Sequence, residues 1–176
     1  MTAENPVADS KPQPHWLRVV AIGRRPRNTF IRIAVLVAAC FVIFKFILLP
    51  VRVEGISMLP TCKNGSIHLV NRLAYLWHEP RRGDVVGIRL AGIHLMYLKR
   101  IIGLPGETVE FENGRVLINN KLLVEPYEKW KCDWTLPAEK LGADEYYVVG
   151  DNRTMPPQDH TKGKVERERI VGRIFL

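Results

Sequence analysis

The chain has 176 residues, 47% of them hydrophobic, and a formal net charge of +8 at neutral pH. These averages fit one basic soluble domain, but the apolar residues gather in the run Ile33–Val51, which only Lys45 interrupts, and this excludes a plain cytosolic globular protein. Half of the excess charge comes from residues 1–32, where six Lys and Arg residues face two acidic ones, so we expect no nucleic-acid partner.

Residues 1–29 predict a disordered tail because they contain four prolines and few apolar side chains. Four arginines stand at the end of this tail and at the start of the apolar run: Arg24, Arg25, Arg27 and Arg32. The positive-inside rule therefore predicts that the tail is cytoplasmic.

Residues 30–51 predict a single transmembrane anchor. Ile33–Val51 contains 19 residues, which at about 1.5 Å per residue approaches the thickness of a hydrocarbon core. Lys45 lies near the far end, where its side chain can reach the headgroups, and Pro50 marks the predicted end of the helix. A cleavable signal peptide is disfavoured because no A-x-A-like pattern follows, and a buried helix is disfavoured because every face is apolar.

Residues 52–176 are then expected to form one domain outside the cytoplasm, attached to the cytoplasmic (inner) membrane and in contact with its lipids. Seven segments rich in β-branched and aromatic residues predict strands: Ser66–Val70, Asp84–Leu90, His94–Ile102, Thr108–Phe111, Arg115–Ile118, Glu145–Val149 and Arg169–Phe175. The predicted fold class is mainly β, an antiparallel sheet or barrel-like domain preceded by one transmembrane helix.

Connections between these strands carry turn signals. Asn113-Gly114 and Asn119-Asn120 predict tight hairpin turns. Asn71–His78 is the one segment expected to form a short helix, and Pro126–Ala143 is expected to be a loop without regular structure.

The cysteines of this domain, Cys62 and Cys132, have no framework spacing, so two independent buried thiols are favoured over a disulfide. No Cys and His spacing is typical of a metal site, and we expect neither a metal nor another cofactor.

Ser57 is the serine whose surroundings suggest chemistry, because Gly55 and Pro60 frame it within Gly-Ile-Ser-Met-Leu-Pro. A serine nucleophile needs a base, and histidine is the usual one. None of the histidines is a clear candidate: His68 and His94 lie in predicted strands, His78 ends the possible helix, and His160 lies in a polar loop.

Lysine is an alternative base when burial makes its neutral form available. The period of two in the predicted strand His94–Ile102 puts Lys99 on the same face as Leu95, Tyr97 and Ile101. An apolar face lowers a lysine pKa, whereas a solvent-facing lysine on an edge strand is the alternative that the pattern leaves open.

Four stretches in chain order resemble the motifs of the bacterial type I signal peptidases, which are membrane-anchored serine proteases with a Ser-Lys dyad. They are Val53–Thr61, Arg82–Val86, Lys99–Glu107 and Gly150–Arg153. The resemblance implies that Ser57 is the nucleophile, Lys99 the general base, and the Ser57 backbone amide an oxyanion donor. It also implies supporting roles for other motif residues: Gly55, Met58, Pro60, Asp151, Asn152 and Arg153.

The chain departs from this family in two places. Some members supply a second oxyanion donor from a serine at the position of Gly55. Pro156 stands where many members have a serine that orients the lysine, and Asp159 is displaced by one from the usual aspartate; Thr154 and Thr161 are both candidates for the missing hydroxyl. Asp151 and Arg153 are expected to form a salt-bridged brace near the site.

The resemblance implies removal of signal peptides from exported preproteins, with small residues at the first and third positions before the bond. Two alternatives stay open: a maturation peptidase dedicated to one exported or conjugative substrate, and a catalytically inactive membrane-tethered binding domain. A self-cleaving repressor of the SOS type is set aside, because Ala91-Gly92 follows Ser57 and a membrane anchor replaces the DNA-binding domain.

Overall fold

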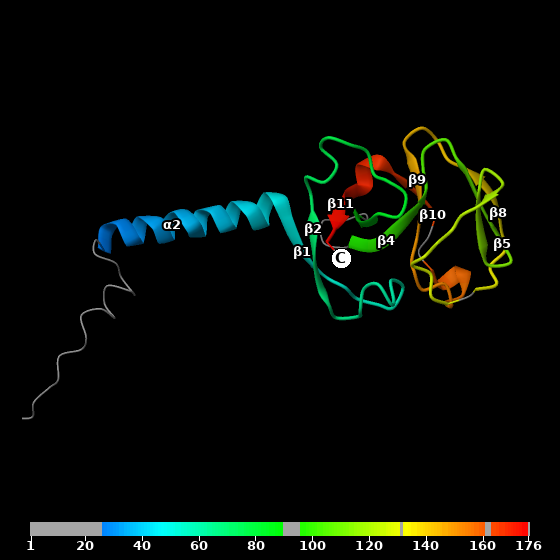
Figure 1. Cartoon of the computed structure of the whole chain (residues 1–176), viewed down its shortest axis with the longest axis horizontal. Helices are drawn as coiled ribbons and strands as arrows, with labels where there is room; N and C mark the ends of the chain where they lie inside the picture. The colour runs from blue at the N-terminus through cyan, green and yellow to red at the C-terminus, as the bar shows by residue number, and fades with distance from the viewer. Residues whose placement is uncertain (1–25, 90–95, 131, 161–162, 176) are drawn as a thin grey trace, which may run out of the picture. The chain divides into compact units, whose positions relative to one another are not determined.

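The computed structural model of the chain describes residues 26–89, 96–130, 132–160 and 163–175 (Figure 1). Its contacts divide the chain after Val42 into two compact units. Each unit is described by itself below.

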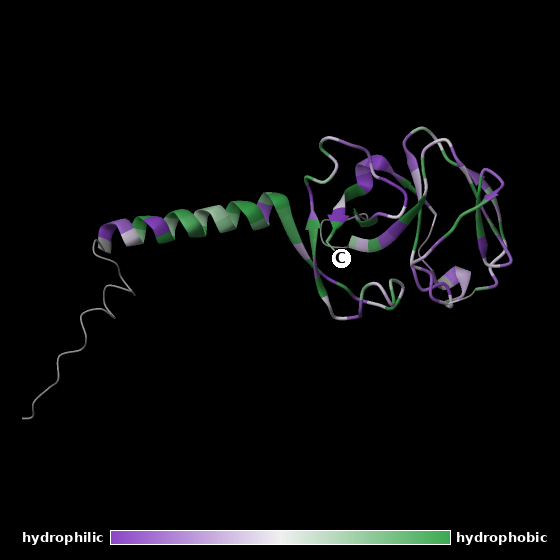
Figure 2. Cartoon of the chain, viewed as in Figure 1, coloured by the Kyte–Doolittle hydropathy of each residue, from purple (hydrophilic) through white to green (hydrophobic). Residues whose placement is uncertain are grey.

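The first unit contains an exposed apolar helix, α2 (Pro26–Val42), which continues as a short π-helical segment, η1 (Ile43–Ile47), in the second unit. Among the described residues, Arg27–Ile47 is the one helix long and apolar enough to cross a membrane. Most of its residues are hydrophobic, as their colours in Figure 2 show. The predicted extent was wrong at both ends: Pro26–Thr29, predicted as part of the disordered tail, is helical, and Leu48–Arg52 forms a strand, so Pro50 does not end the helix.

The second unit contains a seven-stranded antiparallel sheet with the order β1-β2-β11-β3-β4-β9-β10. Its strands are β1 (Leu48–Arg52), β2 (Ile67–Asn71), β3 (Val85–Arg89), β4 (Met96–Gly103), β9 (Glu145–Val149), β10 (Gly163–Glu166) and β11 (Ile170–Ile174). Two short 3₁₀ segments, η2 (Pro157–Asp159) and η3 (Arg167–Arg169), flank β10. β4 lies inside this sheet, between β3 and β9.

A second, four-stranded antiparallel sheet has the order β7-β6-β5-β8. Its strands are β5 (Thr108–Glu112), β6 (Arg115–Ile118), β7 (Lys121–Leu122) and β8 (Leu136–Lys140). Both predicted hairpin turns are confirmed. Asn113 and Gly114 have φ of 47° and 78°, and Asn119 and Asn120 have φ of 51° and 62°, the left-handed values that two-residue hairpin turns require.

The antiparallel β fold is confirmed, and the seven predicted strands correspond to β2, β3, β4, β5, β6, β9 and β11. Leu90, His94 and Leu95, at the ends of two of them, lie outside the described residues. Two other predictions were wrong. In the segment Asn71–His78, predicted as a short helix, Asn71 ends β2 and residues 72–78 form turns and bends, and the predicted loop 126–143 contains β8.

Three clusters of buried apolar side chains form the core of this unit. One of them joins both sheets, because Ile102 of β4 and Tyr147 of β9 pack with Val109 and Phe111 of β5. Another fixes the segment after β1 on β4, through Val53, Met58, Cys62 and Leu98. This second cluster positions residues 53–62 against the strand that carries Lys99.

Candidate active site

Ser57 and Lys99, 42 residues apart in the sequence, meet in the folded chain. Lys99 Nζ donates a 2.8 Å hydrogen bond to Ser57 Oγ. Ser57 lies in the loop that follows β1, and Lys99 lies in the middle of β4. The two residues that the sequence analysis selected independently therefore form one pair.

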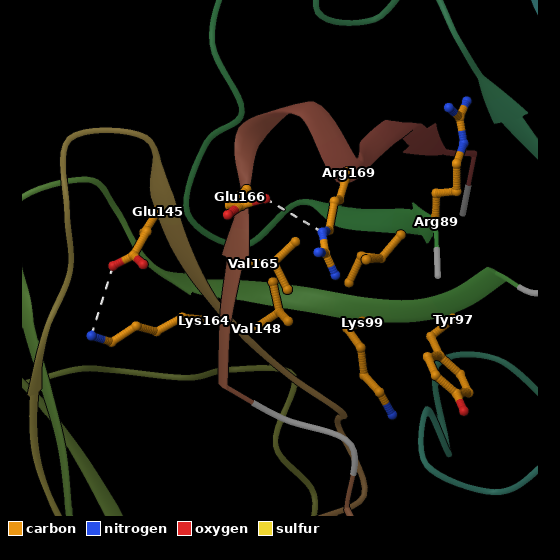
Figure 3. Close-up of a pocket in the computed structure, with 10 residues that line it drawn as sticks. Arg89, Tyr97, Lys99, Glu145, Val148, Lys164, Val165, Glu166 and Arg169 are labelled. Carbon is orange, nitrogen blue, oxygen red and sulfur yellow. Dashed lines mark ion pairs between the residues drawn. The ribbon is translucent and has the colours of Figure 1, made fainter. Parts of the chain in front are cut away.

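Lys99 is only 3% exposed, so the alternative of a solvent-facing lysine on an edge strand is wrong. β3 pairs with β4 at Lys99, whereas β9 pairs with β4 only from Arg100 onward, and Lys99 projects to the same side of β4 as Tyr97 (Figure 3). Its Nζ lies 5.9 Å from the centre of the Tyr97 ring. Burial lowers the pKa of Lys99 from 10.5 to about 8, although the negative charge of Asp151 opposes this shift.

The loop that carries Ser57 is shaped by its own backbone. Gly55 has φ of 101°, a conformation that side-chain-bearing residues avoid, and its N–H donates to Asn64 Oδ1 at 3.0 Å. Met58 is buried and its carbonyl accepts from the N–H of Cys62 at 2.9 Å, whereas Pro60 is exposed. Gly55 thus allows the bend of the loop, and Met58 fixes the loop in the core.

Asn152 connects the fourth motif to this loop. Its backbone N–H donates to the carbonyl of Ser57 at 3.0 Å, and its side-chain amide donates to the carbonyl of Ile56 at 3.1 Å. Gly150 also lies against the loop, because a Cβ built on it would overlap the Ser57 carbonyl oxygen. The fourth motif therefore holds the backbone on which the Ser57 side chain stands.

The expected brace between Asp151 and Arg153 was wrong, because the two residues pair with different partners. Asp151 accepts two hydrogen bonds from Arg100, at 2.8 and 2.6 Å, and one from the Thr61 hydroxyl. Arg153 is paired with Glu125 at 2.7 Å and donates to the Gly150 carbonyl. Asp151 and Arg153 project in different directions, so each pairs with a residue from a distant segment of the chain.

Sequence reasoning missed Arg100, Glu125 and the environment of His160. Arg100 follows Lys99 and projects to the other face of β4. The alternation of side chains along a strand was therefore the signal that could have distinguished the positions of these two residues. Nothing in the local sequence marked Glu125. His160, expected in a polar loop, is buried with 4% of its surface exposed.

Two candidates for the hydroxyl beside Lys99 were Thr154 and Thr161. Thr154 Oγ1 donates to Asn152 Oδ1 at 2.7 Å, and within the described residues no hydrogen bond joins Thr154 to Lys99. Thr161 lies outside the described residues. Pro156 directly precedes η2.

Two hollows adjoin the pair. The smaller, about 40 Å³, lies beside Ser57 and is lined by Val53, Met58, Tyr97 and Leu98 among others. The larger, about 280 Å³, lies beside Lys99 (Figure 3), and its walls carry the ion pairs Glu145–Lys164 and Glu166–Arg169. Tyr97 lines both.

Cys62 and Cys132 are free thiols, and burial raises the pKa of Cys62 to about 11. Within the described residues, no three His, Cys, Asp or Glu side chains gather in a way that would hold a metal ion.

Comparison with known proteins places this chain in a family. The family described as "Signal peptidase, peptidase S26" matches residues 27–176. Signal peptidase I of Leptolyngbya laminosa is 38% identical over 128 residues, 68% of this chain and 63% of that protein, so this chain spans less than two thirds of its length. Signal peptidase I of Bacillus amyloliquefaciens is 35% identical over 164 residues, 85% of each chain.

A crystal structure of a signal peptidase I from Enterococcus faecalis V583 aligns with a TM-score of 0.45 and 24% identity, covering 55% of this chain and 97% of that one. The family match extends over most of the chain and includes the segments that hold Ser57 and Lys99. The chain belongs to the signal peptidase family, peptidase S26.

Proposed function

We propose that this chain removes signal peptides from exported preproteins, with Ser57 as the nucleophile and Lys99 as the general base. The observation that carries the proposal is the 2.8 Å hydrogen bond between the Lys99 amine and the Ser57 hydroxyl at a buried lysine. A base must lie within hydrogen-bond reach of the proton it removes, and its neutral form must be accessible. A pKa of about 8 for Lys99 meets the second requirement in weakly alkaline solution.

In the proposed reaction, neutral Lys99 takes the proton of Ser57 while Ser57 Oγ attacks the scissile carbonyl carbon. The resulting ammonium group then gives this proton to the leaving amine, and the C–N bond breaks to leave an ester on Ser57. Lys99, neutral again, removes a proton from the water that hydrolyses this ester. Lys99 lines the 280 Å³ groove, through which that water can enter.

The tetrahedral intermediate carries a negative oxygen that needs a hydrogen-bond donor. The Ser57 backbone N–H donates to no group among the described residues, so it is available for this oxygen. Gly55 has no hydroxyl to offer, and its N–H is already bonded to Asn64. The proposal therefore assigns the main oxyanion contact to the Ser57 amide.

A substrate can bind as an additional strand beside β4. β9 pairs with β4 from Arg100 to Gly103, and among the described strands none continues this pairing along Met96–Lys99. An extended peptide can add main-chain hydrogen bonds to such an unpaired edge. The 40 Å³ hollow beside Ser57 then receives the side chain before the scissile bond, and its size favours a small residue such as alanine.

The proposed function includes a membrane location. The apolar helix Arg27–Ile47 would cross the cytoplasmic membrane once, with the arginines before it on the cytoplasmic side and the β domain outside. Trp77, which is 84% exposed, and Phe175 line a third hollow together with Ile47, and these side chains are suited to contact lipids. Protease added outside intact spheroplasts should digest the β domain; complete protection would contradict this orientation.

Cleavage of a preprotein with an A-x-A site by the purified full-length chain in detergent tests the proposal. The wild type should cut, and Ser57→Ala and Lys99→Ala should each lower kcat by at least about 1,000-fold because the dyad acts as a unit. Ser66→Ala and Lys121→Ala are matched controls and should keep wild-type rates. A wild type no faster than the dyad variants would overturn the proposal and favour a binding domain.

Replacing alanine before the scissile bond by leucine tests the hollow. The larger side chain should reduce kcat/KM by at least about 100-fold, because it does not fit beside Met58 and Leu98. Cleavage of several unrelated preproteins at similar rates would support a general signal peptidase, whereas cleavage of a single one would support the dedicated maturation peptidase.

A further inference from the structure

The buried imidazole of His160 is connected to the Ser57 loop through one intervening residue, Asn152. His160 follows η2, and its Nε2 lies 2.6 Å from the backbone carbonyl oxygen of Asn152. A carbonyl oxygen only accepts hydrogen bonds, so Nε2 carries the proton that is donated to it. The contact therefore fixes both the tautomer and the orientation of the ring.

Asn152 passes this contact on to the nucleophile loop through its two other polar groups. Its N–H bonds the Ser57 carbonyl and its side-chain amide bonds the Ile56 carbonyl, at 3.0 and 3.1 Å. His160 thus fixes the one main-chain group of Asn152 that the loop does not use. Three hydrogen bonds, all made by Asn152, therefore connect the imidazole to the carbonyls of Ile56 and Ser57.

The ring also packs against Gly150 and Trp134. A Cβ built on Gly150 would lie 2.5 Å from His160 Cε1, so Gly150 lies directly against the ring as well as against the Ser57 carbonyl. Trp134 meets the ring edge-on, with 5.0 Å between ring centres and an interplanar angle of 71°. The Trp134 indole N–H donates to the Met155 carbonyl at 3.1 Å, which fixes the indole in turn.

We propose that His160 is a positioning residue, which acts through Asn152 to hold Ser57 Oγ within reach of Lys99. This inference rests on the proposed function, since it concerns the placement of the same nucleophile. Reaction rates depend steeply on such placement, and a displacement of about 1 Å can cost 100-fold. His160 itself touches neither the substrate nor the reacting atoms in this role.

Two variants of similar shape separate the hydrogen bond from the packing. His160→Gln keeps an N–H donor at the end of the side chain, and His160→Met fills comparable space without one. His68→Leu is the matched control, because His68 is a partly buried histidine that bonds Ser66 Oγ at 3.0 Å. The measurements are kcat and KM for an A-x-A peptide in detergent, with kcat expressed per active site titrated by a serine-directed acylating reagent.

We expect His160→Met to lower kcat per titrated site by about 10- to 100-fold with KM changed less than about two-fold. His160→Gln should recover most of this loss, and His68→Leu should keep wild-type kcat. A merely structural role would reduce the number of titrated sites and leave kcat per site unchanged, which would overturn the inference. Equal losses in His160→Gln and His160→Met would overturn it too.

Should His160→Met fail to fold, Asn152→Ala tests the next contact in the same path and should lower kcat per titrated site similarly; wild-type kcat there would overturn the inference. A wild-type chain that neither cleaves the peptide nor reacts with the acylating reagent would overturn the proposed function itself. An active wild type with an unimpaired His160→Met would overturn the positioning role alone.

Discussion

Arg100 donates two hydrogen bonds to Asp151, from Nε to Oδ1 at 2.8 Å and from Nη2 to Oδ2 at 2.6 Å, on the face of β4 opposite Lys99. The pair is 6% and 0% exposed at its side chains, and the Arg100 guanidinium also lies 3.9 Å above the Tyr127 ring. Burial by itself would lower the pKa of Arg100, but the hydrogen bonds and charge of Asp151 raise it above the ordinary value. Arg100 therefore stays charged and needs its partner.

Asp151→Ala should destabilise the chain by about 3–5 kcal/mol, because it leaves a buried guanidinium without a counter-ion. The double variant Arg100→Met, Asp151→Leu should regain most of that loss. Thermal unfolding of the full chain in detergent measures both. Arg167→Met is the control, since it breaks an ion pair with the exposed Glu79 and should cost less than about 1 kcal/mol. A double variant no more stable than Asp151→Ala would argue against the charge explanation.

The rate of peptide cleavage should depend on the protonation of Lys99. Below pH 8 the amine is mostly protonated and unable to act as a base, so kcat/KM should rise about ten-fold per pH unit up to about pH 8 and then level off. A pH–rate profile between pH 6 and 10 measures this. Burial is the cause of the low pKa, so a rate that still rises ten-fold per unit at pH 10 would contradict the lowered pKa of Lys99.

Lys99 should also make the folded chain less stable at neutral pH. Below about pH 8 the lysine is protonated in both the folded and the unfolded chain, and burying its charge costs about 3 kcal/mol, as the difference between 10.5 and about 8 implies. Between pH 8 and 10.5 the unfolded chain binds the extra proton, so stability rises with pH and the cost disappears.

Lys99→Met should therefore raise the melting temperature at pH 7 while abolishing cleavage, and this gain should shrink toward pH 10.5. Thermal unfolding at both pH values provides the comparison. Lys121→Met, a change at an exposed strand residue, should give neither a gain of this size nor this pH dependence. A Lys99→Met variant less stable than the wild type at pH 7 would contradict the desolvation argument.

Gly150→Ala should inactivate the enzyme out of proportion to the size of a methyl group. The added Cβ would overlap the Ser57 carbonyl oxygen, a backbone atom that can move only if the nucleophile loop moves. We expect at least about a 100-fold loss of kcat, measured with the A-x-A peptide. Gly142→Ala is the control, because its Cβ would meet only the flexible Glu145 side chain, at 3.3 Å. Similar activity in the two variants would refute the close approach.

The sequence predicted the interior strands and missed the edge strands. β1, β10, β7 and β8 lie at the ends of the two sheets, and none of them was among the seven predicted segments. The interior strands β3, β4 and β9 are buried on both faces and are rich in apolar residues, whereas edge strands tolerate residues such as Pro50 and Pro137 that lack a donor. β1 was hidden for a further reason, since its apolar residues directly continue those of the helix.

The sequence motifs and the alternation of side chains along strands were enough to predict part of the candidate site. The period of two placed Lys99 beside Tyr97, but its hydrogen-bond partner Ser57 lies 42 residues earlier in the chain. Likewise, Asp151 and Arg153 looked like partners because they are close in sequence. Their actual partners, Arg100 and Glu125, come from distant segments, and local sequence holds no information about such pairings.

The direct passage from the apolar helix into β1 limits how far the reaction can take place from the bilayer. Ser57 is the tenth residue after Ile47, the end of the helix, and a fully extended chain of ten residues spans at most about 35 Å. With the helix across the membrane as proposed, this segment holds Ser57 within that distance of the bilayer. A scissile bond must come within this short radius, which a signal peptide still inserted in the same bilayer does, while a site far along an exported chain does not.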